Sequence, residues 1–257
     1  MVFDQTGNIY GTAIGAGSGY GYAFELTPSG GKWMETTIYT FGNGDAPAYP
    51  YSGVIFDNAG NLYGTSLEGG TKIGSYGTVY ELMPSGPPWA ENTLYSFGGG
   101  DDGRYPKGGV IFDSSGNLYG ATDDGVVFEL SPGAPWNYKA LYTFVCPCSA
   151  EGGPWASLVM DASGNLYGTA YSDGNPSKNY GYGSVFKLTP QLDGTWTYNS
   201  LHDFCAGGRP CSDGAYPIST VVMDANGNLY GTTTYGGTGS NCYPGNNGCG
   251  VVWEITP

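Results

Sequence analysis

The sequence predicts an all-β protein, a single five-bladed β-propeller in which one blade lacks its outer strand. The peptide GNLYGT or a close variant of it occurs five times, beginning at residues 7, 60, 116, 164 and 227. A short apolar run that ends in Asp precedes each copy, and successive Asp residues lie 53, 56, 48 and 63 residues apart. This spacing suits a four-stranded blade with a loop of variable length and is too long for helical-hairpin repeats.

The repeat runs through the whole chain, which favours one domain over residues 1–257 rather than two smaller ones. The chain holds 47 Gly and 17 Pro, and because the pattern recurs regularly we interpret them as turn and bulge residues. The predicted repeats are residues 1–51, 52–107, 108–155, 156–218 and 219–257.

The second repeat shows how the residues make a blade. SGVIFD, which ends at Asp57, is a short apolar strand, and NAGN is a tight turn in which Gly60 can adopt a positive φ. The chain returns as the strand NLYGT, and TVYELMP and ENTLYSF supply the third and fourth strands. We expect the Asp57 carboxylate to accept backbone N–H bonds across the turn, which makes its recurrence structural. Apolar residues on both strand faces indicate a sheet packed between two neighbours.

The fourth strand occurs four times, as TTIYTF, NTLYSF, KALYTF and NSLHDF, and the sequence given ends at VVWEITP. We therefore expect one blade either to have three strands or to receive its edge strand from another segment or molecule. For a closed ring, residues 1–4 are expected to lie next to the blade that ends at Pro257.

The charge balance excludes several partners. The net charge is −14, and the eight basic residues are scattered along the chain, so nucleic acids and anionic membranes are poor partners. No apolar run approaches the roughly 20 residues that span a bilayer. The sequence indicates no cofactor and no metal site.

The six cysteines all lie in predicted loops. Cys205 and Cys211 bracket one short loop and Cys242 and Cys249 another, which predicts two disulfides in a protein from an oxidising compartment. For Cys146 and Cys148 the sequence allows two states. They form a third disulfide in a small ring, or they are free or otherwise paired thiols. The acidity and the few lysines also favour an exported protein.

The repeated DxxGNLYGT-like segment, the GG-containing loop after it and the FELTP and LYSF strands resemble the GloVer repeat, over the whole chain. That family occurs in tandem in exported bacterial proteins with varied C-terminal surface anchors, so the resemblance implies an extracellular or surface location. It supplies no catalytic motif. DxxGNLY is also similar to a pattern of NHL-type propellers, in which the strand before the motif is innermost.

With that strand order, the loops between second and third strands and between fourth and first strands share one irregular face. Loops on a rigid scaffold concentrate binding residues, and aromatic rings beside carboxylates suit sugars. The residues expected on this face are Tyr20, Tyr22, Tyr49, Tyr51, Tyr76, Tyr105, Trp155, Tyr180, Tyr182, Tyr216, Tyr235 and Tyr243, with Asp45, Asp101, Asp102, Asp123, Asp173 and Asp213.

The alternative role for these aromatic residues is packing against neighbouring blades. The motif DGxxP, at residues 102 and 213, is interpreted as a repeated turn rather than a site. His202 stands where the other fourth strands have Tyr, which we interpret as sequence variation. Glu25, Glu81, Glu129 and Glu254 share one third-strand position, with Lys187 in the fourth repeat, and we interpret this position as partly exposed.

The function predicted from these features is binding of a glycan or other extracellular ligand on the irregular face. The first alternative is a glycoside hydrolase or lyase that uses a pair of Asp or Glu residues, about 5 to 10 Å apart, at the channel mouth. The second is a structural surface or assembly module that associates with itself through the incomplete blade. Motifs for serine, zinc and nucleotide chemistry are absent from the sequence.

Overall fold

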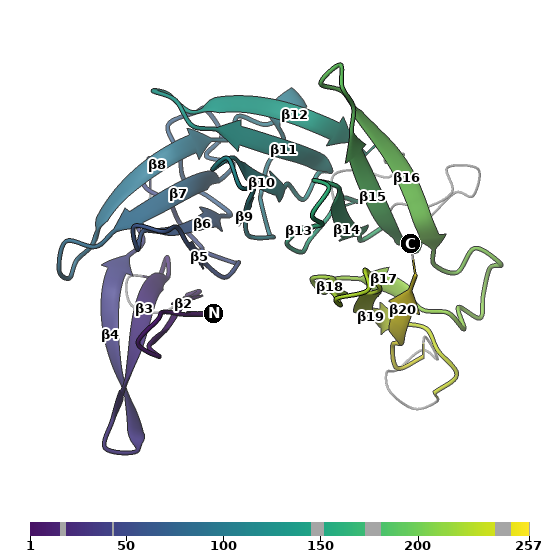
Figure 1. Cartoon of the computed structure of the whole chain (residues 1–257), viewed down its shortest axis with the longest axis horizontal. Helices are drawn as coiled ribbons and strands as arrows, with labels where there is room; N and C mark the ends of the chain where they lie inside the picture. Colours follow the sequence, from purple (N-terminus) through teal and green to yellow (C-terminus); the bar gives the residue numbers. More distant parts are fainter. Residues whose placement is uncertain (16–18, 43, 145–151, 173–180, 240–247, 257) are drawn as a thin grey trace.

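The five repeats fold into five small antiparallel sheets that follow one another around a propeller (Figure 1). The structure is a computed structural model and describes the chain except residues 16–18, 43, 145–151, 173–180, 240–247 and 257. One 3₁₀ turn, Gly100–Asp102, is the only helical element in the described part of the chain. The predicted five-bladed all-β fold is confirmed.

Blades 1 to 4 each hold four strands in chain order, with the first strand nearest the centre of the ring and the fourth outermost (Figure 1). The strands are β1 (Val2–Phe3), β2 (Ile9–Ala13), β3 (Tyr22–Ser29) and β4 (Lys32–Thr40) in blade 1; β5 (Ile55–Phe56), β6 (Leu62–Ser66), β7 (Thr78–Met83) and β8 (Ala90–Ser96) in blade 2; β9 (Ile111–Phe112), β10 (Leu118–Ala121), β11 (Val126–Ser131) and β12 (Asn137–Thr143) in blade 3; β13 (Val159–Met160), β14 (Leu166–Ala170), β15 (Ser184–Pro190) and β16 (Trp196–Asp203) in blade 4.

Blade 5 is the incomplete blade. Its central strand is β19 (Leu229–Tyr235), which pairs with β17 (Ala215–Pro217), β18 (Val222–Met223) and β20 (Val252–Ile255). Within the described residues β20 pairs only with β19, so the position of the outer strand is unfilled. This confirms the prediction that one blade lacks its outer strand.

The DxxGN turns are held by their aspartates. Asp57 Oδ1 accepts the N–H groups of Ala59 and Asn61 at 2.8 and 2.9 Å, and Oδ2 accepts the Asn61 amide at 2.9 Å and the Tyr63 hydroxyl at 3.2 Å. Gly60, with φ of 89°, closes the turn in a conformation that side chains disfavour. The same aspartate bonds recur in the other four turns, so the recurrence is structural.

Hydrophobic cores fill the spaces between successive blades. Adjacent residues of a strand point to opposite sheet faces, so Leu62 packs toward blade 1 while Tyr63 packs toward blade 3. Four such clusters join blades 1 to 2, 2 to 3, 3 to 4 and 4 to 5. No core cluster of the described residues joins blade 5 to blade 1.

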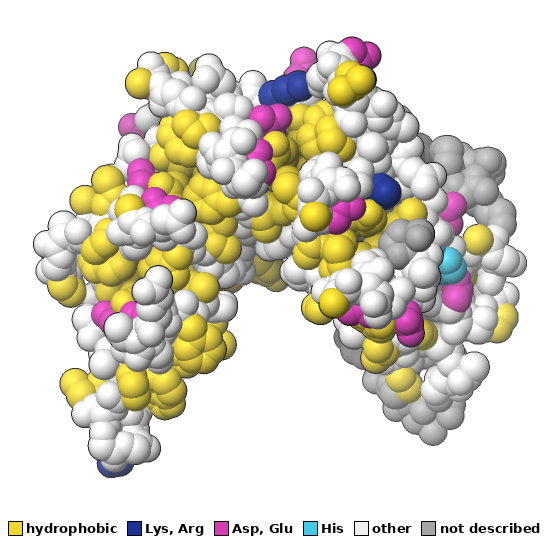
Figure 2. All heavy atoms as spheres, in the orientation of Figure 1, with side chains coloured by type: hydrophobic (Ala, Val, Ile, Leu, Met, Phe, Trp, Pro, Cys, Tyr) yellow, Lys and Arg dark blue, Asp and Glu magenta, His cyan; other side chains and the backbone are white. Residues whose placement is uncertain are grey.

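The ring is open between blades 1 and 5. Figure 1 shows the two blades facing each other across a gap, and Figure 2 shows the same opening between their atoms. The expectation that residues 1–4 lie beside the blade ending at Pro257 is therefore wrong. The physical reason is that the four packed interfaces turn the chain through less than a full circle, which leaves one face of each end blade without a neighbour.

The described residues contain no helix that is long and apolar enough to cross a membrane.

Candidate functional site

The irregular face carries a tyrosine pair that recurs in three repeats. Tyr20 lies against Tyr49 with ring centroids 5.6 Å apart, and the equivalent pair Tyr76 and Tyr105 lies at the same distance. The third pair, Tyr182 and Tyr216, lies at 5.7 Å. In each pair the backbone N–H of the second tyrosine donates to the carbonyl of the first, at 2.8, 2.8 and 2.6 Å. The pairs thus serve as a repeated connection between neighbouring blades.

The second tyrosine of every pair adopts a left-handed conformation. The φ angles of Tyr49, Tyr105 and Tyr216 are 56°, 55° and 58°. Bulky residues rarely adopt this conformation, so the surrounding structure has to hold it. The YP sequence that these three tyrosines share therefore has the same backbone conformation at three places in the ring, and at Tyr216 it lies in strand β17.

In the described part of the chain, the pair between blades 4 and 5 grows into a larger aromatic cluster. Tyr216 also lies 5.0 Å from Tyr171 and 5.9 Å from Tyr235, measured between ring centroids. Tyr171 in turn stacks on Trp155 at 4.1 Å with an interplanar angle of 6°. Five rings, including Tyr182, therefore form one continuous surface on this part of the face.

The cluster arises where the fourth and fifth repeats depart from the pattern. Aligned on GNLYG, Tyr171 occupies the position of Leu67 in the second repeat and Asp123 in the third. Tyr235 occupies the position held by Glu68 in the second repeat. These exchanges place rings beside Tyr216, whereas the equivalent residues for Tyr105, Leu67 and Asp124, are not aromatic. Tyr235 is among the site residues predicted from the sequence. Tyr171 is not, although its departure from the repeat could have indicated it.

The four tyrosine rings of this surface line a cleft of about 500 Å³. We call it the tyrosine cleft. Arg209 enters it from a loop closed by the Cys205–Cys211 disulfide, which confirms that predicted bond. Gly236 forms part of the wall, where a Cβ would lie 2.4 Å from the Cys211 carbonyl oxygen. The cleft is lined by Tyr171, Tyr182, Arg209, Pro210, Cys211, Ala215, Tyr216, Tyr235, Gly236, Gly237 and Gly248.

The far end of the aromatic surface is fixed by an ion pair. Lys107 Nζ lies 3.3 Å from the centroid of the Trp155 ring and 2.9 Å from Asp123 Oδ2. Because Tyr171 stacks on the same indole at 4.1 Å, the ammonium and the phenol ring must lie on opposite faces of it. Asp123 is buried, so its predicted role at the site is indirect, through Lys107 and the indole.

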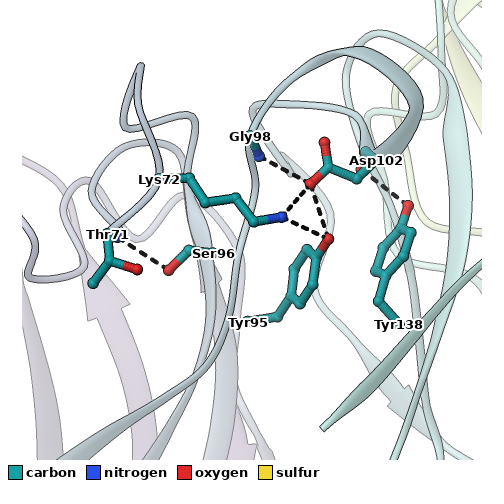
Figure 3. A network of polar contacts seen from close by, with 7 residues as sticks. All are labelled: Thr71, Lys72, Tyr95, Ser96, Gly98, Asp102 and Tyr138. Atoms are coloured by element: carbon teal, nitrogen blue, oxygen red, sulfur yellow. Dashed lines mark hydrogen bonds and ion pairs between the residues drawn. The ribbon is translucent and has the colours of Figure 1, made fainter. Parts of the chain in front are cut away.

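Asp102 lies in a structural network away from the tyrosine cleft (Figure 3). Its Oδ2 accepts Lys72 Nζ at 2.6 Å, the Tyr95 hydroxyl at 2.9 Å and the Gly98 N–H at 3.0 Å. Burial would raise the pKa of Asp102, but these donors outweigh it and lower the pKa. The carboxylate thus anchors the loop after β8.

Asp213 has the equivalent place after β16. It accepts the Cys205 N–H at 3.0 Å and lies 3.1 Å from His202 Nε2. His202 therefore takes the partner role that Tyr95 has toward Asp102, which agrees with its interpretation as a sequence variation.

Several predicted site residues lie apart from the tyrosine cleft. Tyr22 lies in β3 and its pKa is raised by a hydrogen bond with Glu35. Asp45 and Tyr51 are exposed loop residues, Asp101 is exposed in the 3₁₀ turn, and none of the three lines it. Tyr180, Tyr243 and Asp173 lie outside the described residues, as do Cys146, Cys148 and Cys242, so the Cys242–Cys249 disulfide stays a prediction.

The third-strand carboxylates serve the motif tyrosines. The hydroxyls of Tyr10 and Tyr63 donate to Glu25 and Glu81 at 2.8 and 2.7 Å. In the described part of the chain, no three His, Cys, Asp or Glu residues are grouped closely enough to hold a metal ion.

Five blades of one repeated sequence define the class of this protein, a tandem-repeat β-propeller. The model of the Gloeobacter/Verrucomicrobia repeat matches residues 1–243, and the chain belongs to that family. A search of curated proteins finds no match to this chain.

Two solved structures are similar to this chain. A candidate gluconolactonase is 17% identical over 98% of this chain and 71% of its own, with a TM-score of 0.52. A gluconolactonase from Xanthomonas campestris is 13% identical over 96% of this chain and 71% of its own, with a TM-score of 0.49. At these identities the likeness concerns the fold.

Proposed function

We propose that this propeller binds a glycan or other extracellular ligand in the tyrosine cleft between blades 4 and 5. The observation that carries the proposal is the convergence of Tyr171, Tyr182, Tyr216 and Tyr235 on one cleft of about 500 Å³. Sugar rings stack their C–H faces on aromatic rings, and their hydroxyls need polar partners. Phenol hydroxyls, the Arg209 guanidinium and backbone groups of the glycines supply such partners.

The composition of the cleft favours binding over hydrolysis. Its described lining contains no Asp or Glu, whereas glycoside hydrolysis needs two carboxyl groups beside the scissile bond. The carboxylates Asp203 and Asp213 line a neighbouring hollow of about 780 Å³ together with His202, and this hollow shares Arg209 and Pro210 with the cleft. A carbohydrate-active enzyme, the second candidate function, would place its chemistry in this hollow.

Location outside the cytoplasm is part of the same proposal. The Cys205–Cys211 disulfide supports it, because such bonds persist in oxidising compartments.

A glycan array with the purified chain, followed by a reducing-sugar assay on every hit, tests the two functions. Binding without release of reducing ends supports the proposal, and turnover supports the enzyme. Asp213→Asn then locates the chemistry, because an amide keeps the shape but cannot act as acid, base or nucleophile. Asp102→Asn is the matched control, since Asp102 anchors the equivalent loop after β8. If the array and calorimetry give no glycan hit, the proposal fails for glycans.

A further inference from the structure

The two end blades expose, at the opening of the ring, residues whose repeat equivalents form the cores between the other blades. Val252 in β20 pairs with Thr232, as Val79 in β7 pairs with Thr65. Val79 is completely buried, whereas Val252 is 79% exposed. Val222 in β18 is likewise exposed, although its equivalent Ile55 packs in the core between blades 2 and 3.

Blade 1 shows the complementary face. Met1 occupies the position of Val54, which is 3% exposed in the core between blades 1 and 2, but Met1 is 82% exposed. Phe3 and Trp33 are also exposed, while Trp89, the equivalent of Trp33, packs against that core. Figure 2 shows apolar side chains along both sides of the opening.

The two faces differ in kind. Blade 5 presents the face that blades 1 to 4 turn toward the following blade, and blade 1 presents the face that blades 2 to 5 turn toward the preceding one. A unit that packs against both blade 5 and blade 1 must have one face that fits the preceding blade and one that fits the following blade. That description fits a blade of this same repeat.

The unpaired edge of β20 adds a second requirement for the unit that fills the opening. In blades 1 to 4 the third strand pairs with an outer strand, whereas in the described part of blade 5 β20 pairs with β19 alone. An exposed strand edge is a template for pairing with another strand. The occupant must therefore offer an outer strand of the NTLYSF type as well as a blade.

We propose that the open side of the ring is a docking face for one further repeat of the same sequence type. This repeat supplies the outer strand of blade 5 and a blade that packs between blades 5 and 1. The four existing interfaces argue for this occupant, because the exposed faces continue them position by position.

The chain contains the material for a direct test. Residues 85–144 comprise the turn after β7, the outer strand β8 and the complete blade 3, and EITP at the end of the sequence aligns with ELMP before residue 85. A chain with a second copy of residues 85–144 appended after Pro257 offers the proposed unit in register. The measurements are the melting temperature, the mass in solution and amide hydrogen exchange of β20 and β2, which reports local opening.

The proposal predicts a monomer with a higher melting temperature and exchange slowed roughly 10-fold or more in both β20 and β2. Val252→Lys should leave the melting temperature of the original chain unchanged, because the residue is exposed there. In the extended chain the same change should remove most of the increase in melting temperature. Val79→Lys, at the equivalent buried position, should destabilise either chain.

Two results would overturn the proposal. One is an extension that leaves the melting temperature and the exchange of both strands unchanged. The other is a stable dimer of the original chain that Val252→Lys dissociates, because the occupant would then be a second copy.

Discussion

The two faces of this propeller are made by the same five repeats but use them differently. On the face of the DxxGN turns, five aspartates make the same hydrogen bonds five times. On the opposite face the described residues form three tyrosine pairs, and further rings join the pair that contains Tyr216. Repetition therefore maintains the scaffold, and departure from repetition creates the candidate site.

The largest expected effect is that of low pH, which protonates the aspartates of all five turns. Burial raises the pKa of these aspartates, but the N–H and O–H donors of each turn outweigh it. The pKa is therefore lowered at Asp4, Asp57, Asp113, Asp161 and Asp224. A depressed pKa contributes stability above the unfolded value of about 3.9, and that stability is lost as pH falls through the folded values. We expect the melting temperature to fall steeply below about pH 4. An unchanged melting temperature between pH 5 and 3 would contradict this.

A single turn should show part of that effect. Asp57→Ala leaves the donors of Ala59, Asn61 and Tyr63 without their acceptor, and we expect a loss of about 3 kcal/mol of unfolding free energy by denaturant titration. Asp101→Ala, at an exposed position of the 3₁₀ turn after β8, is the control and should change stability by less than about 0.5 kcal/mol. An equal loss of unfolding free energy in the two variants would contradict the claim that the DxxGN turns stabilise the scaffold more than the loops of the opposite face.

These turns were the most predictable part of the molecule. Each depends on residues within six positions of one another, so the local sequence determines the geometry. The open ring could not be predicted in this way, because the angle between blades depends on how whole sheets pack. The tyrosine cleft was predicted in part. Trp155, Tyr182, Tyr216 and Tyr235 belong to its aromatic surface, but Tyr20, Tyr49, Tyr76 and Tyr105 form separate pairs along the ring.

The disulfide links the scaffold to the cleft. Replacing Cys205 and Cys211 by Ser should cost about 2 kcal/mol by the loop-entropy relation, and should weaken ligand binding further because the closed loop carries Arg209. Alkylation without reductant, followed by intact-mass measurement, should leave both cysteines unmodified in the parent protein. Modification of either one would refute the bond.

The smallest expected effect is at His202. His202→Tyr restores the residue of the other fourth strands, and Tyr95 shows that a hydroxyl can bond the equivalent aspartate. We expect stability to change by less than about 0.5 kcal/mol and ligand binding to persist. Loss of a measured turnover in this variant would instead indicate chemistry in the hollow lined by His202 and Asp213.

The most direct test compares two tyrosines that share a backbone conformation and a pair geometry but differ in their surroundings. Tyr216→Ala and Tyr105→Ala each remove the left-handed tyrosine of one pair, so their costs in stability should be similar. Calorimetric titration with a glycan from the array should show affinity reduced about 10-fold or more, roughly 1.4 kcal/mol, for Tyr216→Ala and unchanged for Tyr105→Ala. Equal affinities for the two variants would contradict a binding site in the tyrosine cleft.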